Sequence, residues 1–333
     1  MVSAQTTTLI TGAAGFIGSH IARALLARGE RVVGLDSFDD FYDPAIKRDR
    51  TAALAAVGGD RFTLIEADVR DEAAVERAYA EHGVGSTIHL AARAGVRPSI
   101  ANPALYASVN VTGTAVMLEA ARKAHPEGPF LLASSSSVYG NNKKVPFAEG
   151  DDVEAPISPY AATKRSAELL ARTCHELYGM PTACLRFFTV YGPGQRPDLA
   201  IAKFMRLIHA GEPIPVFGDG SMQRDYTYID DVVGGVLAAR DRIGAHGYRI
   251  WNLGSDRPVR LDELIGMIGR VVGREPMIDR RPVPPGDVVR TCADLTRSRA
   301  ELGYEPATGF EDGLGRQLEA SSVKKPLAPA TSH

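Results

Sequence analysis

The sequence predicts an α/β fold, with a doubly wound parallel sheet and a smaller C-terminal lobe. Two patterns support this prediction. Short apolar runs alternate with helix-length segments through the first half of the chain, and a glycine-rich turn follows the first run. Strands separated by helices of that length form parallel sheets with right-handed crossovers. Because the runs are continuously apolar, we expect the strands to be buried on both faces.

The expected elements alternate regularly up to about residue 187. Strands are predicted at residues 9–11, 31–36, 62–66, 87–91, 130–134 and 182–187, and helices at 16–28, 44–57, 72–81, 104–123 and 159–178. After residue 188 Gly and Pro become frequent, and short strands mix with helices. We therefore expect a dinucleotide-binding domain at 1–187, a smaller substrate lobe at 188–320 that can share elements with it, and a disordered tail at 321–333.

Composition excludes several classes of protein. The chain has 333 residues, 44% of them hydrophobic, and a formal net charge of -2, so non-specific binding to nucleic acid is not expected. No apolar run is long enough to span a bilayer, and no signal-type segment precedes the first strand. The three cysteines have neither disulfide nor metal-ligand spacing. We expect a cytoplasmic protein with no metal site and no membrane association.

The glycine-rich turn has the chemistry of a dinucleotide site. Gly12, Gly15 and Gly18 are spaced as GxxGxxG between the first strand and the first helix. Glycines there permit a tight turn, a close approach of the backbone to a pyrophosphate, and packing of helix on strand. Asp36 ends the second strand, where a carboxylate binds ribose hydroxyls and repels a 2′-phosphate. This predicts NAD as the cofactor, although Asp36 could instead cap a turn.

A tyrosine and a lysine form the candidate catalytic pair. Tyr160 and Lys164 have the YxxxK spacing, which places both on one face of a helix. A nearby ammonium is expected to lower the tyrosine pKa from about 10 toward neutrality and to produce a general base. The alternative is a surface pair on an amphipathic helix. Four serines, 134–137, end the fifth strand, where such folds place ligands, or else form a polar turn.

Six segments together resemble one known family. They are TGAAGFIGSH, HLAARAGVR, SSSSVYG, SPYAATK, LRFFTVYGP and FGDGSMQRDYTYIDD, which occur in this order over roughly residues 8–315. The chain resembles the extended short-chain dehydrogenases/reductases, which have a Rossmann fold, and among them the nucleotide-sugar epimerase/dehydratase group. Within the group the resemblance is greatest to the UDP-glucuronate 4-epimerases.

The resemblance implies a role for each matching residue. Tyr160 would be the base, Lys164 its partner and a ligand of the nicotinamide ribose, and Ser135 a hydrogen-bond partner of the sugar O4. The implied cofactor-binding residues are Gly12, Gly15, Phe16, Ile17, Gly18, Asp36, Asp68, Val69, Leu90, Ala91, Ala92, Asn110, Tyr160 and Lys164. The implied substrate-binding residues are Ser136, Ser137, Thr189, Arg196, Val216, Phe217, Arg224 and Asp287.

The serine run helps to choose the reaction. In the 4,6-dehydratases that the chain resembles, an Asp and a Glu follow the catalytic hydroxyl, and the related uronate decarboxylases keep a Glu. Here those positions are Ser136 and Ser137, which cannot perform that acid–base work. The expected reaction is therefore 4-epimerisation of a UDP-sugar through a 4-keto intermediate.

The choice of sugar depends on a few positions. Galactose-type epimerases usually have Asn at the position of Thr189 and Arg at the position of Pro284, whereas the glucuronate enzymes have Thr189 and the sequence QRPD that contains Arg196. This favours UDP-glucuronate. The alternatives are a UDP-glucose or UDP-N-acetylglucosamine 4-epimerase and, from another class, a non-catalytic NAD-binding sensor. The resemblance also implies a homodimer that pairs helices 104–123 and 159–178.

Overall fold

The computed structural model describes residues 6–282 and 288–321. Its centre is a parallel sheet of seven strands in the order β10-β6-β5-β4-β1-β2-β3. The strand order reverses direction between β1 and β4, as expected of a doubly wound sheet. The strands are β1 (Thr7–Thr11), β2 (Arg31–Asp36), β3 (Phe62–Glu66), β4 (Val84–His89), β5 (Phe130–Ser135), β6 (Thr182–Phe187) and β10 (Tyr248–Leu253).

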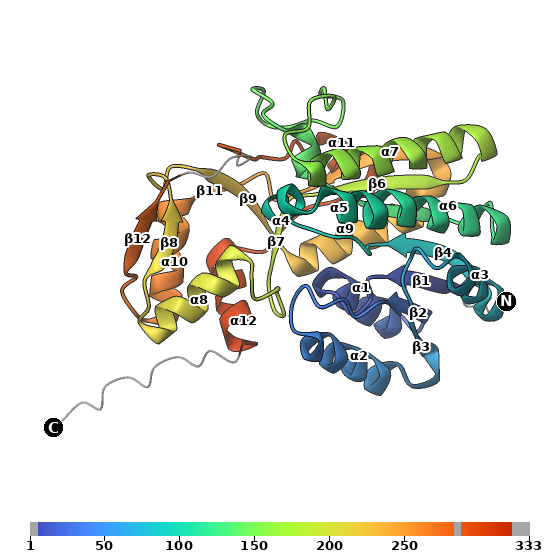
Figure 1. Cartoon of the computed structure of the whole chain (residues 1–333), viewed down its shortest axis with the longest axis horizontal. Helices are drawn as coiled ribbons and strands as arrows, with labels where there is room; N and C mark the ends of the chain where they lie inside the picture. Colours follow the sequence, from blue (N-terminus) through green and yellow to red (C-terminus); the bar gives the residue numbers. More distant parts are fainter. Residues whose placement is uncertain (1–5, 283–287, 322–333) are drawn as a thin grey trace.

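Helices cover both faces of this sheet (Figure 1). Helices α3 (Glu72–His82), α6 (Gly113–Ala124) and α7 (Pro159–Tyr178) lie side by side on one face. Helices α1 (Phe16–Ala27), α2 (Pro44–Gly58) and α9 (Ile229–Arg242) lie on the other.

Successive strand residues enter separate cores, as the alternation of a β-strand requires. Leu9 packs with α3 and α6, whereas Ile10 packs with α1 and α9. The predicted fold class is confirmed.

The seventh strand comes from the second half of the chain. β10 pairs in parallel with β6 at the edge of the sheet, so a strand from beyond residue 188 belongs to the central sheet. Sequence analysis did not predict it because Arg249 and Asn252 interrupt its apolar pattern. Both polar residues have partners: Arg249 contacts Glu301, and the Asn252 amide donates to the Phe147 carbonyl at 2.8 Å.

The predicted helix at 104–123 is present, but a π-helical turn interrupts it. The chain forms α4 (Val96–Ala101), α5 (Pro103–Ala107), a π-helical turn η2 (Ser108–Thr112) and then α6. The π turn widens the helix where Asn110 leaves it to bond the loop after β4, with Asn110 Oδ1 accepting from the Arg93 amide at 2.8 Å. π-helical turns inside helices frequently mark functional sites.

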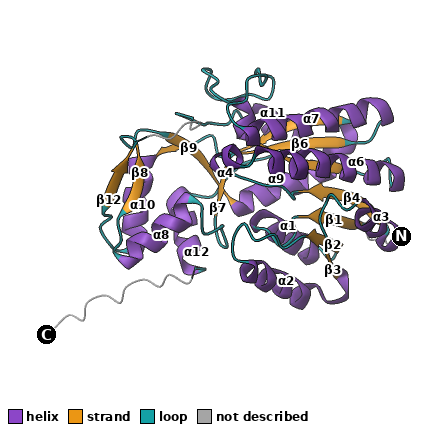
Figure 2. Cartoon of the chain, viewed as in Figure 1, coloured by secondary structure: helices purple, strands orange, loops and turns teal. Residues whose placement is uncertain are grey.

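The smaller lobe combines two short sheets with helices, shown by type in Figure 2. One sheet has the order β11-β9-β7, from β7 (Thr189–Tyr191), β9 (Gln223–Tyr228) and β11 (Pro258–Arg260); the other pairs β8 (Ile214–Phe217) with β12 (Ile278–Arg281). Its helices are α8 (Ala200–Ala210), α10 (Leu261–Val272) and α12 (Phe310–Glu319), while α11 (Thr296–Leu302) packs against α9 and β10. Short 3-10 turns complete the described chain: η1 (Gly59–Arg61), η3 (Ser136–Tyr139) and η4 (Ile243–Ala245).

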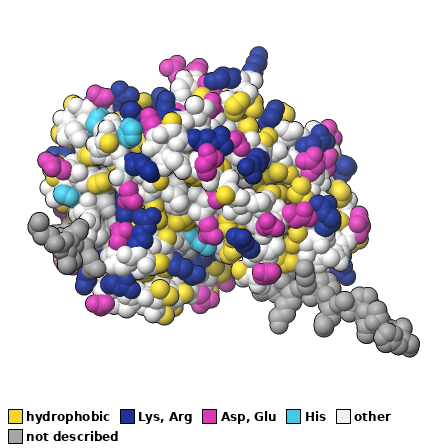
Figure 3. Space-filling view, turned by 180° about the vertical axis from the view of Figure 1, so that it is seen from behind, with side chains coloured by type: hydrophobic (Ala, Val, Ile, Leu, Met, Phe, Trp, Pro, Cys, Tyr) yellow, Lys and Arg dark blue, Asp and Glu magenta, His cyan; other side chains and the backbone are white. Residues whose placement is uncertain are grey.

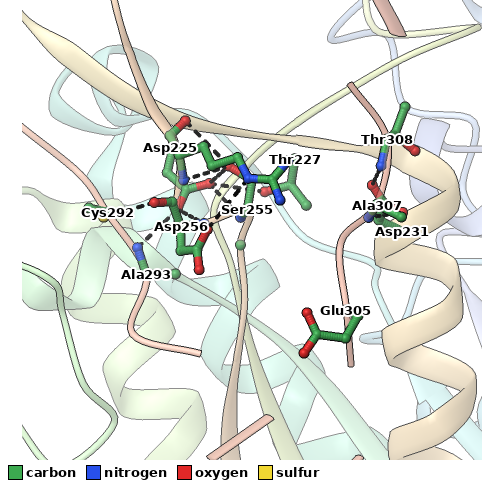
Figure 4. A network of polar contacts seen from close by, with 12 residues as sticks. Asp225, Thr227, Asp231, Ser255, Asp256, Cys292, Ala293, Glu305, Ala307 and Thr308 are labelled. Carbon is green, nitrogen blue, oxygen red and sulfur yellow. Dashed lines mark hydrogen bonds and ion pairs between the residues drawn. The ribbon is translucent and has the colours of Figure 1, made fainter. Parts of the chain in front are cut away.

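A buried carboxylate joins three segments at the base of the lobe. Asp225 on β9 is fully buried and lies at the centre of the network in Figure 4. Its Oδ2 accepts hydrogen bonds from the Asp256 amide at 3.1 Å and the Ala293 amide at 2.9 Å. Its Oδ1 accepts from the Ser255 amide at 2.7 Å and the Ser255 hydroxyl at 2.8 Å. The β9 strand, the turn after β10 and the segment after residue 290 are thereby fixed to one another.

The surface is electrostatically mixed. On the face seen in Figure 3, acidic and basic side chains are interspersed, which agrees with the net charge of -2. Within residues 6–282 and 288–321, no helix is both long and apolar enough to cross a membrane.

Candidate active site

A cavity of about 410 Å³ opens at the carboxyl ends of the central strands. This is where open α/β sheets bind ligands. One wall comes from the ends of β1, β2, β4 and β5, and the other comes from β7 and the loop that follows it. Of the predicted site residues, the cavity is lined by Gly12, Gly15, Phe16, Ile17, Gly18, Asp36, Asp68, Val69, Leu90, Ala91, Ala92, Ser135, Tyr160, Lys164, Thr189 and Arg196.

The glycine turn lies in close contact with strand β1, helix α1 and the loop after β4 that contains Ala91. Gly12 has a φ of +70°, and a Cβ there would lie 2.9 Å from the Ala91 nitrogen. A Cβ at Gly18 would lie 2.2 Å from the Gly12 carbonyl oxygen. Both positions therefore require glycine. The turn directs the positive end of the α1 dipole into the cavity, which suits a pyrophosphate.

Asp36 is held at the cavity wall by the backbone around it. Its Oδ2 accepts from the Ala14 amide at 3.0 Å and its Oδ1 from the Phe38 amide at 2.9 Å. The carboxylate is therefore fixed in position, and each oxygen has a further lone pair for a ribose hydroxyl. Asp36 thus also braces the glycine turn.

Asp68 has a strong ionic partner. Its carboxylate accepts from Arg70 Nε at 2.8 Å and Nη2 at 2.7 Å, and this pairing holds the pKa of Asp68 below its usual range. Three residues later, Asp71 caps helix α3, with its Oδ1 accepting from the Ala74 amide. Asp68 remains in the cavity lining beside Val69.

A buried polar chain supports the loop after β4. Thr11 Oγ1 contacts His89 Nδ1 at 2.7 Å, and His89 Nε2 contacts Thr114 Oγ1 at 3.1 Å. The Thr114 hydroxyl donates to the Asn110 carbonyl, so it accepts from His89, and the imidazole carries its proton on Nε2. Burial lowers the pKa of His89 to about 3, which keeps the ring neutral.

Asn110 does not line the cavity, contrary to its predicted role. Its amide donates to the Arg93 carbonyl at 3.0 Å and to Thr163 Oγ1 at 3.0 Å. It is almost fully buried, so it supports the cavity wall rather than forming it.

Tyr160, Lys164 and Ser135 all lie in the cavity lining. Lys164 Nζ donates to the Ala133 carbonyl at 2.7 Å, and burial lowers its pKa to about 8. The pKa of Tyr160 is raised by burial, with a smaller opposing effect from its hydrogen bond with Ser135.

The expectation of a lowered tyrosine pKa is therefore wrong: the Tyr160 pKa is raised. Burial is the largest effect on the Tyr160 pKa, and the Ser135 hydrogen bond and the charge of Arg196 oppose it only in part.

A second buried pair lies behind the catalytic residues. Glu168, one helical turn after Lys164, accepts two hydrogen bonds from Arg186 at 2.9 Å each and one from Ser134 at 2.6 Å. Ser134 is thereby assigned a structural role within the serine run. The Glu168 carboxylate also partly offsets the fall in the Lys164 pKa.

Only some of the residues predicted to hold the sugar lie in the cavity lining. Thr189 and Arg196 line the cavity, whereas Ser136 and Ser137 do not. The 3-10 turn η3 carries the chain away from the cavity after Ser135, and the Ser137 amide bonds back to the Ser135 hydroxyl at 3.2 Å. The Arg196 guanidinium pairs with Asp198, with Nη2 to Oδ2 at 2.7 Å.

The residues predicted to bind the nucleotide lie in the lobe, outside the cavity lining. Val216 is buried in the lobe core, and the Phe217 ring contacts the Arg97 guanidinium at 4.3 Å from its centroid. Arg224 Nη1 donates to the Gln223 carbonyl at 2.9 Å. Asp287 and Pro284 fall outside the described residues.

Sequence analysis missed a group of residues around the loop after β2. Asp39, Phe41, Tyr42, Lys47 and Arg93 all line the cavity. Arg93 forms an ion pair with Asp39, and the Lys47 ammonium donates to the Asp39 carbonyl at 2.6 Å. The available signal was the cluster of acidic and aromatic residues directly after Asp36, followed by basic residues in the next helix.

Comparisons with known proteins agree on one family. A model of the NAD dependent epimerase/dehydratase family matches residues 8–254. The chain is 41% identical over 328 residues to a probable UDP-glucuronate 4-epimerase of Rhizobium meliloti, covering 93% of this chain and 95% of that protein. It is 41% identical over 321 residues to UDP-glucuronate 4-epimerase 3 of Arabidopsis thaliana, covering 92% and 74%.

Solved structures resemble the whole chain. UDP-glucuronic acid 4-epimerase from Bacillus cereus, in complex with UDP-glucuronic acid and NAD, superposes with a TM-score of 0.88 at 32% identity, covering 95% of this chain and 98% of that one. A UDP-glucose 4-epimerase of Thermotoga maritima with UDP-glucose gives 0.84 at 30% identity, covering 95% and 98%.

Proposed function

The chain belongs to the NAD dependent epimerase/dehydratase family, and from this premise we propose that it interconverts UDP-glucuronate and UDP-galacturonate by epimerisation at C4. One observation carries this proposal: a single cavity contains the dinucleotide turn, the Ser135–Tyr160–Lys164 set, and the pair Thr189 and Arg196. Relatives at 41% identity named as UDP-glucuronate 4-epimerases support the choice of sugar.

The residues present fit NAD. Gly12 and Gly18 admit a pyrophosphate beside the α1 N-terminus, and Asp36 offers fixed carboxylate oxygens to a ribose. The negative charge of Asp36 disfavours a 2′-phosphate and hence NADP. Bound NAD supplies the acceptor and donor of the hydrogen at C4. Lys164, in the cavity lining, would bind the nicotinamide ribose.

The protein's own contribution is proton transfer at the sugar O4. The Tyr160 phenolate takes the hydroxyl proton when the C4–O bond becomes a carbonyl, and returns it when the hydroxyl re-forms. Ser135 orients the same oxygen by a hydrogen bond. Because burial raises the pKa of Tyr160 while the Ser135 hydrogen bond and the Arg196 charge oppose the rise, the phenolate depends on these two groups for its stabilisation.

Recognition of the charged sugar rests on Thr189 and Arg196. The 4-keto uronate is a β-keto acid, which loses carbon dioxide when the C5–C6 bond stands perpendicular to the ketone plane. A hydroxyl and a guanidinium that hold the carboxylate in another orientation would protect it. Ser136 and Ser137 lack the acid–base chemistry of the dehydratases, and they lie outside the cavity lining.

The lobe residues complete the proposed nucleotide site. We place the diphosphate near Arg224 and the uracil beside Val216 and Phe217. Figure 1 shows the lobe beyond the carboxyl ends of the strands, on the side where the cavity opens. The predicted role of Asp287 remains a proposal of the same kind.

Two further properties are proposed with the function. The exposed apolar side chains of α7, Leu169, Leu177 and Tyr178, suit pairing of two copies along this helix. All three cysteines are free thiols, which fits a cytoplasmic location.

One experiment distinguishes the proposed function from its alternatives. Purified protein is incubated separately with UDP-glucuronate, UDP-glucose and UDP-N-acetylglucosamine, and the products are resolved by NMR. We expect UDP-galacturonate from UDP-glucuronate, with little UDP-pentose and little turnover of the neutral sugars. Faster turnover of UDP-glucose would favour a galactose-type epimerase. Absence of turnover, with NAD bound, would favour a sensor.

A further inference from the structure

Two loops from different parts of the chain meet at the cavity. The β2 loop, residues 37–43, follows Asp36 and therefore adjoins the proposed ribose site. The β7 loop, residues 192–199, carries Arg196, the proposed ligand of the sugar carboxylate. Both contribute residues to the lining. A single side chain, Arg50 of α2, bonds to both.

Arg50 makes three hydrogen bonds to three different segments. Its Nη1 donates to the Ala14 carbonyl of the glycine turn at 3.1 Å and to the Tyr42 hydroxyl of the β2 loop at 2.9 Å. Its Nη2 donates to the Gly194 carbonyl of the β7 loop at 2.6 Å. A guanidinium has the planar fork geometry that such a junction needs.

The β7 loop is fixed on both sides. Toward the lobe, the Gln195 amide donates to the Val190 carbonyl, and Gln195 also bonds to Gln317 of α12. Toward the sheet, Arg50 bonds Gly194, and His20 Nε2 contacts the Pro193 carbonyl at 2.9 Å. Arg50 and His20 therefore each link this loop to the dinucleotide-binding half.

The position of Arg196 depends on both loops. Its guanidinium lies 4.8 Å from the centroid of the Phe41 ring in the β2 loop and pairs with Asp198 in its own loop. If the two loops moved apart, the guanidinium would lose its aromatic support. Arg196 would then sample several orientations, at an entropic cost when a carboxylate binds.

We propose that Arg50 is a positioning residue for recognition of the charged sugar. By tying the β2 loop to the β7 loop, it holds Arg196 in one geometry relative to the ribose site. The inference rests on the proposed function for the identity of the anion, but the tie between the loops can be tested without any sugar.

The first test measures binding to the NAD-loaded protein by calorimetry, with UDP-glucuronate, UDP-glucose and UDP as ligands. Arg50→Met should weaken UDP-glucuronate about tenfold, while UDP and UDP-glucose change by less than about twofold, because only the carboxylate needs Arg196. Arg50→Lys should recover only part of the affinity for UDP-glucuronate. The ammonium can still donate to a carbonyl, but it lacks the planar fork of arginine and reaches fewer of the three acceptors. Equal weakening of all three ligands, or no change, would overturn the proposal.

Arg61→Met provides the matched control. Arg61 also ties a backbone carbonyl, donating to Leu26 at the end of α1 at 2.7 Å, but this bond involves neither the β2 loop nor the β7 loop. Binding of all three ligands should match the wild type. A selective loss for UDP-glucuronate in this control would overturn the assignment of the effect to Arg50.

The second test measures hydrogen exchange of the NAD-loaded protein without sugar. Arg50→Met should speed exchange within residues 192–199 and leave α9 unchanged. Unchanged exchange in the β7 loop would overturn the positioning role, whichever sugar is the substrate. If wild-type protein binds UDP-glucose as tightly as UDP-glucuronate, the proposed function fails, whereas the exchange result still decides whether Arg50 ties the loops.

Discussion

Tyr160 and Lys164 lie four residues apart on α7, where this helix packs on β5. The Lys164 side chain is buried and the Tyr160 side chain is partly buried. Lys164 bonds the Ala133 carbonyl, and its pKa falls to about 8 because burial disfavours the ammonium. Burial also raises the pKa of Tyr160. The spacing of the pair predicted that both residues share one face of a helix, but only the packing around them determines the direction in which each pKa moves.

Replacing Tyr160 with phenylalanine should remove the base with little change in shape. We expect Tyr160→Phe to lower turnover by roughly 10²–10⁴-fold, the usual contribution of a general base. Binding of UDP-sugar should persist because the phenol acts on the O4 proton. Turnover is followed by NMR and binding by calorimetry. Turnover within about threefold of the wild type would show that another group is the base.

Lys164→Met should abolish turnover and also change how stability depends on pH. The folded-state pKa of about 8 lies below the ordinary 10.5, so below pH 8 the buried ammonium costs stability, by up to roughly 3 kcal/mol. Between these values the unfolded chain holds the extra proton, so wild-type stability rises with pH. The variant should therefore gain stability relative to the wild type at pH 7, and lose that advantage by about pH 10.5.

The measurement is denaturant unfolding of both proteins, freed of bound nucleotide, from pH 7 to 10.5. The difference in stability isolates Lys164, because other titrating groups act equally on both proteins. A difference that stays constant across this range would contradict a lowered pKa for Lys164.

Thr189 tests the carboxylate site more directly than Arg196, because it is smaller and pairs with no ion. Thr189→Val keeps the shape and removes the hydroxyl. Hydrogen bonds to charged groups are worth roughly 1.5–3 kcal/mol, so UDP-glucuronate turnover should fall about tenfold or more. Release of carbon dioxide should rise, because the carboxylate is less well held. An equal loss with UDP-glucose would indicate that Thr189 only packs.

The β1–α1 turn is the element whose local sequence specifies it most completely. A Cβ at residue 18 would lie 2.2 Å from the Gly12 oxygen and 3.0 Å from the Ala13 Cα. Gly18→Ala should therefore push α1 away from β1, destabilise the protein and reduce the NAD that copurifies. Thermal unfolding and acid release of the nucleotide measure both effects.

Gly234→Ala is the matched control for that substitution. Gly234 lies in α9, and a Cβ there has no heavy atom within 4 Å apart from its own helix. This substitution should leave NAD content unchanged and raise stability by up to about 1 kcal/mol, because alanine favours the helix. A Gly18→Ala protein that retained both stability and NAD would refute the packing role of the turn.

Elements whose partners lie in the local sequence were predictable. Strands β2, β3 and β6 occur within the predicted bounds because each is a short apolar run between turn signals. Strand β10 and the π turn η2 could not be predicted from the local sequence. Strand β10 depends on its edge position beside β6, and η2 depends on the Asn110–Arg93 contact. Neither partner is visible in the sequence around the element.

The same distinction applies to the site. Gly12 and Asp36 follow from strand ends and turn chemistry, so they could be placed from the sequence, and NAD as the cofactor is confirmed for the family. Arg93 lines the cavity and Arg50 supports its loops, each through contacts with residues far along the chain, and no spacing rule identifies them. Ser137 shows the converse: adjacent to Ser135 in sequence, it turns out of the cavity lining.

At the scale of the whole molecule, the lobe and the sheet are joined through buried polar groups as well as apolar packing. Asp225 holds the β9 strand to residues 255–256 and 293. Its burial raises its pKa, and its hydrogen bonds compensate for the cost of placing a carboxylate there. The proposed NAD site lies at the sheet and the proposed UDP site lies in the lobe. Weakening this junction should therefore affect the binding of UDP more than the binding of NAD.

Asp225→Asn tests that separation. In either orientation of the amide, its NH₂ group would face backbone N–H donors, at Ser255 on one side or at Asp256 and Ala293 on the other. Lost charge-assisted bonds and the unsatisfied donors should cost about 2 kcal/mol or more. UDP binding should weaken, because Arg224 and the segment after residue 290 depend on this junction. NAD should still copurify, because Asp36 and the glycine turn are untouched.

The matched substitution is Asp219→Asn, at an exposed turn where the carboxylate bonds Ser221. Asp219→Asn should change the free energy of unfolding by less than about 0.5 kcal/mol, because surface substitutions usually have effects of that size. Denaturant unfolding, calorimetry with UDP and acid release of NAD provide the three readouts. Parallel loss of UDP and NAD in Asp225→Asn would mean that the carboxylate supports the whole fold and not the junction. Unchanged UDP binding would mean that the lobe keeps its place through apolar contacts alone.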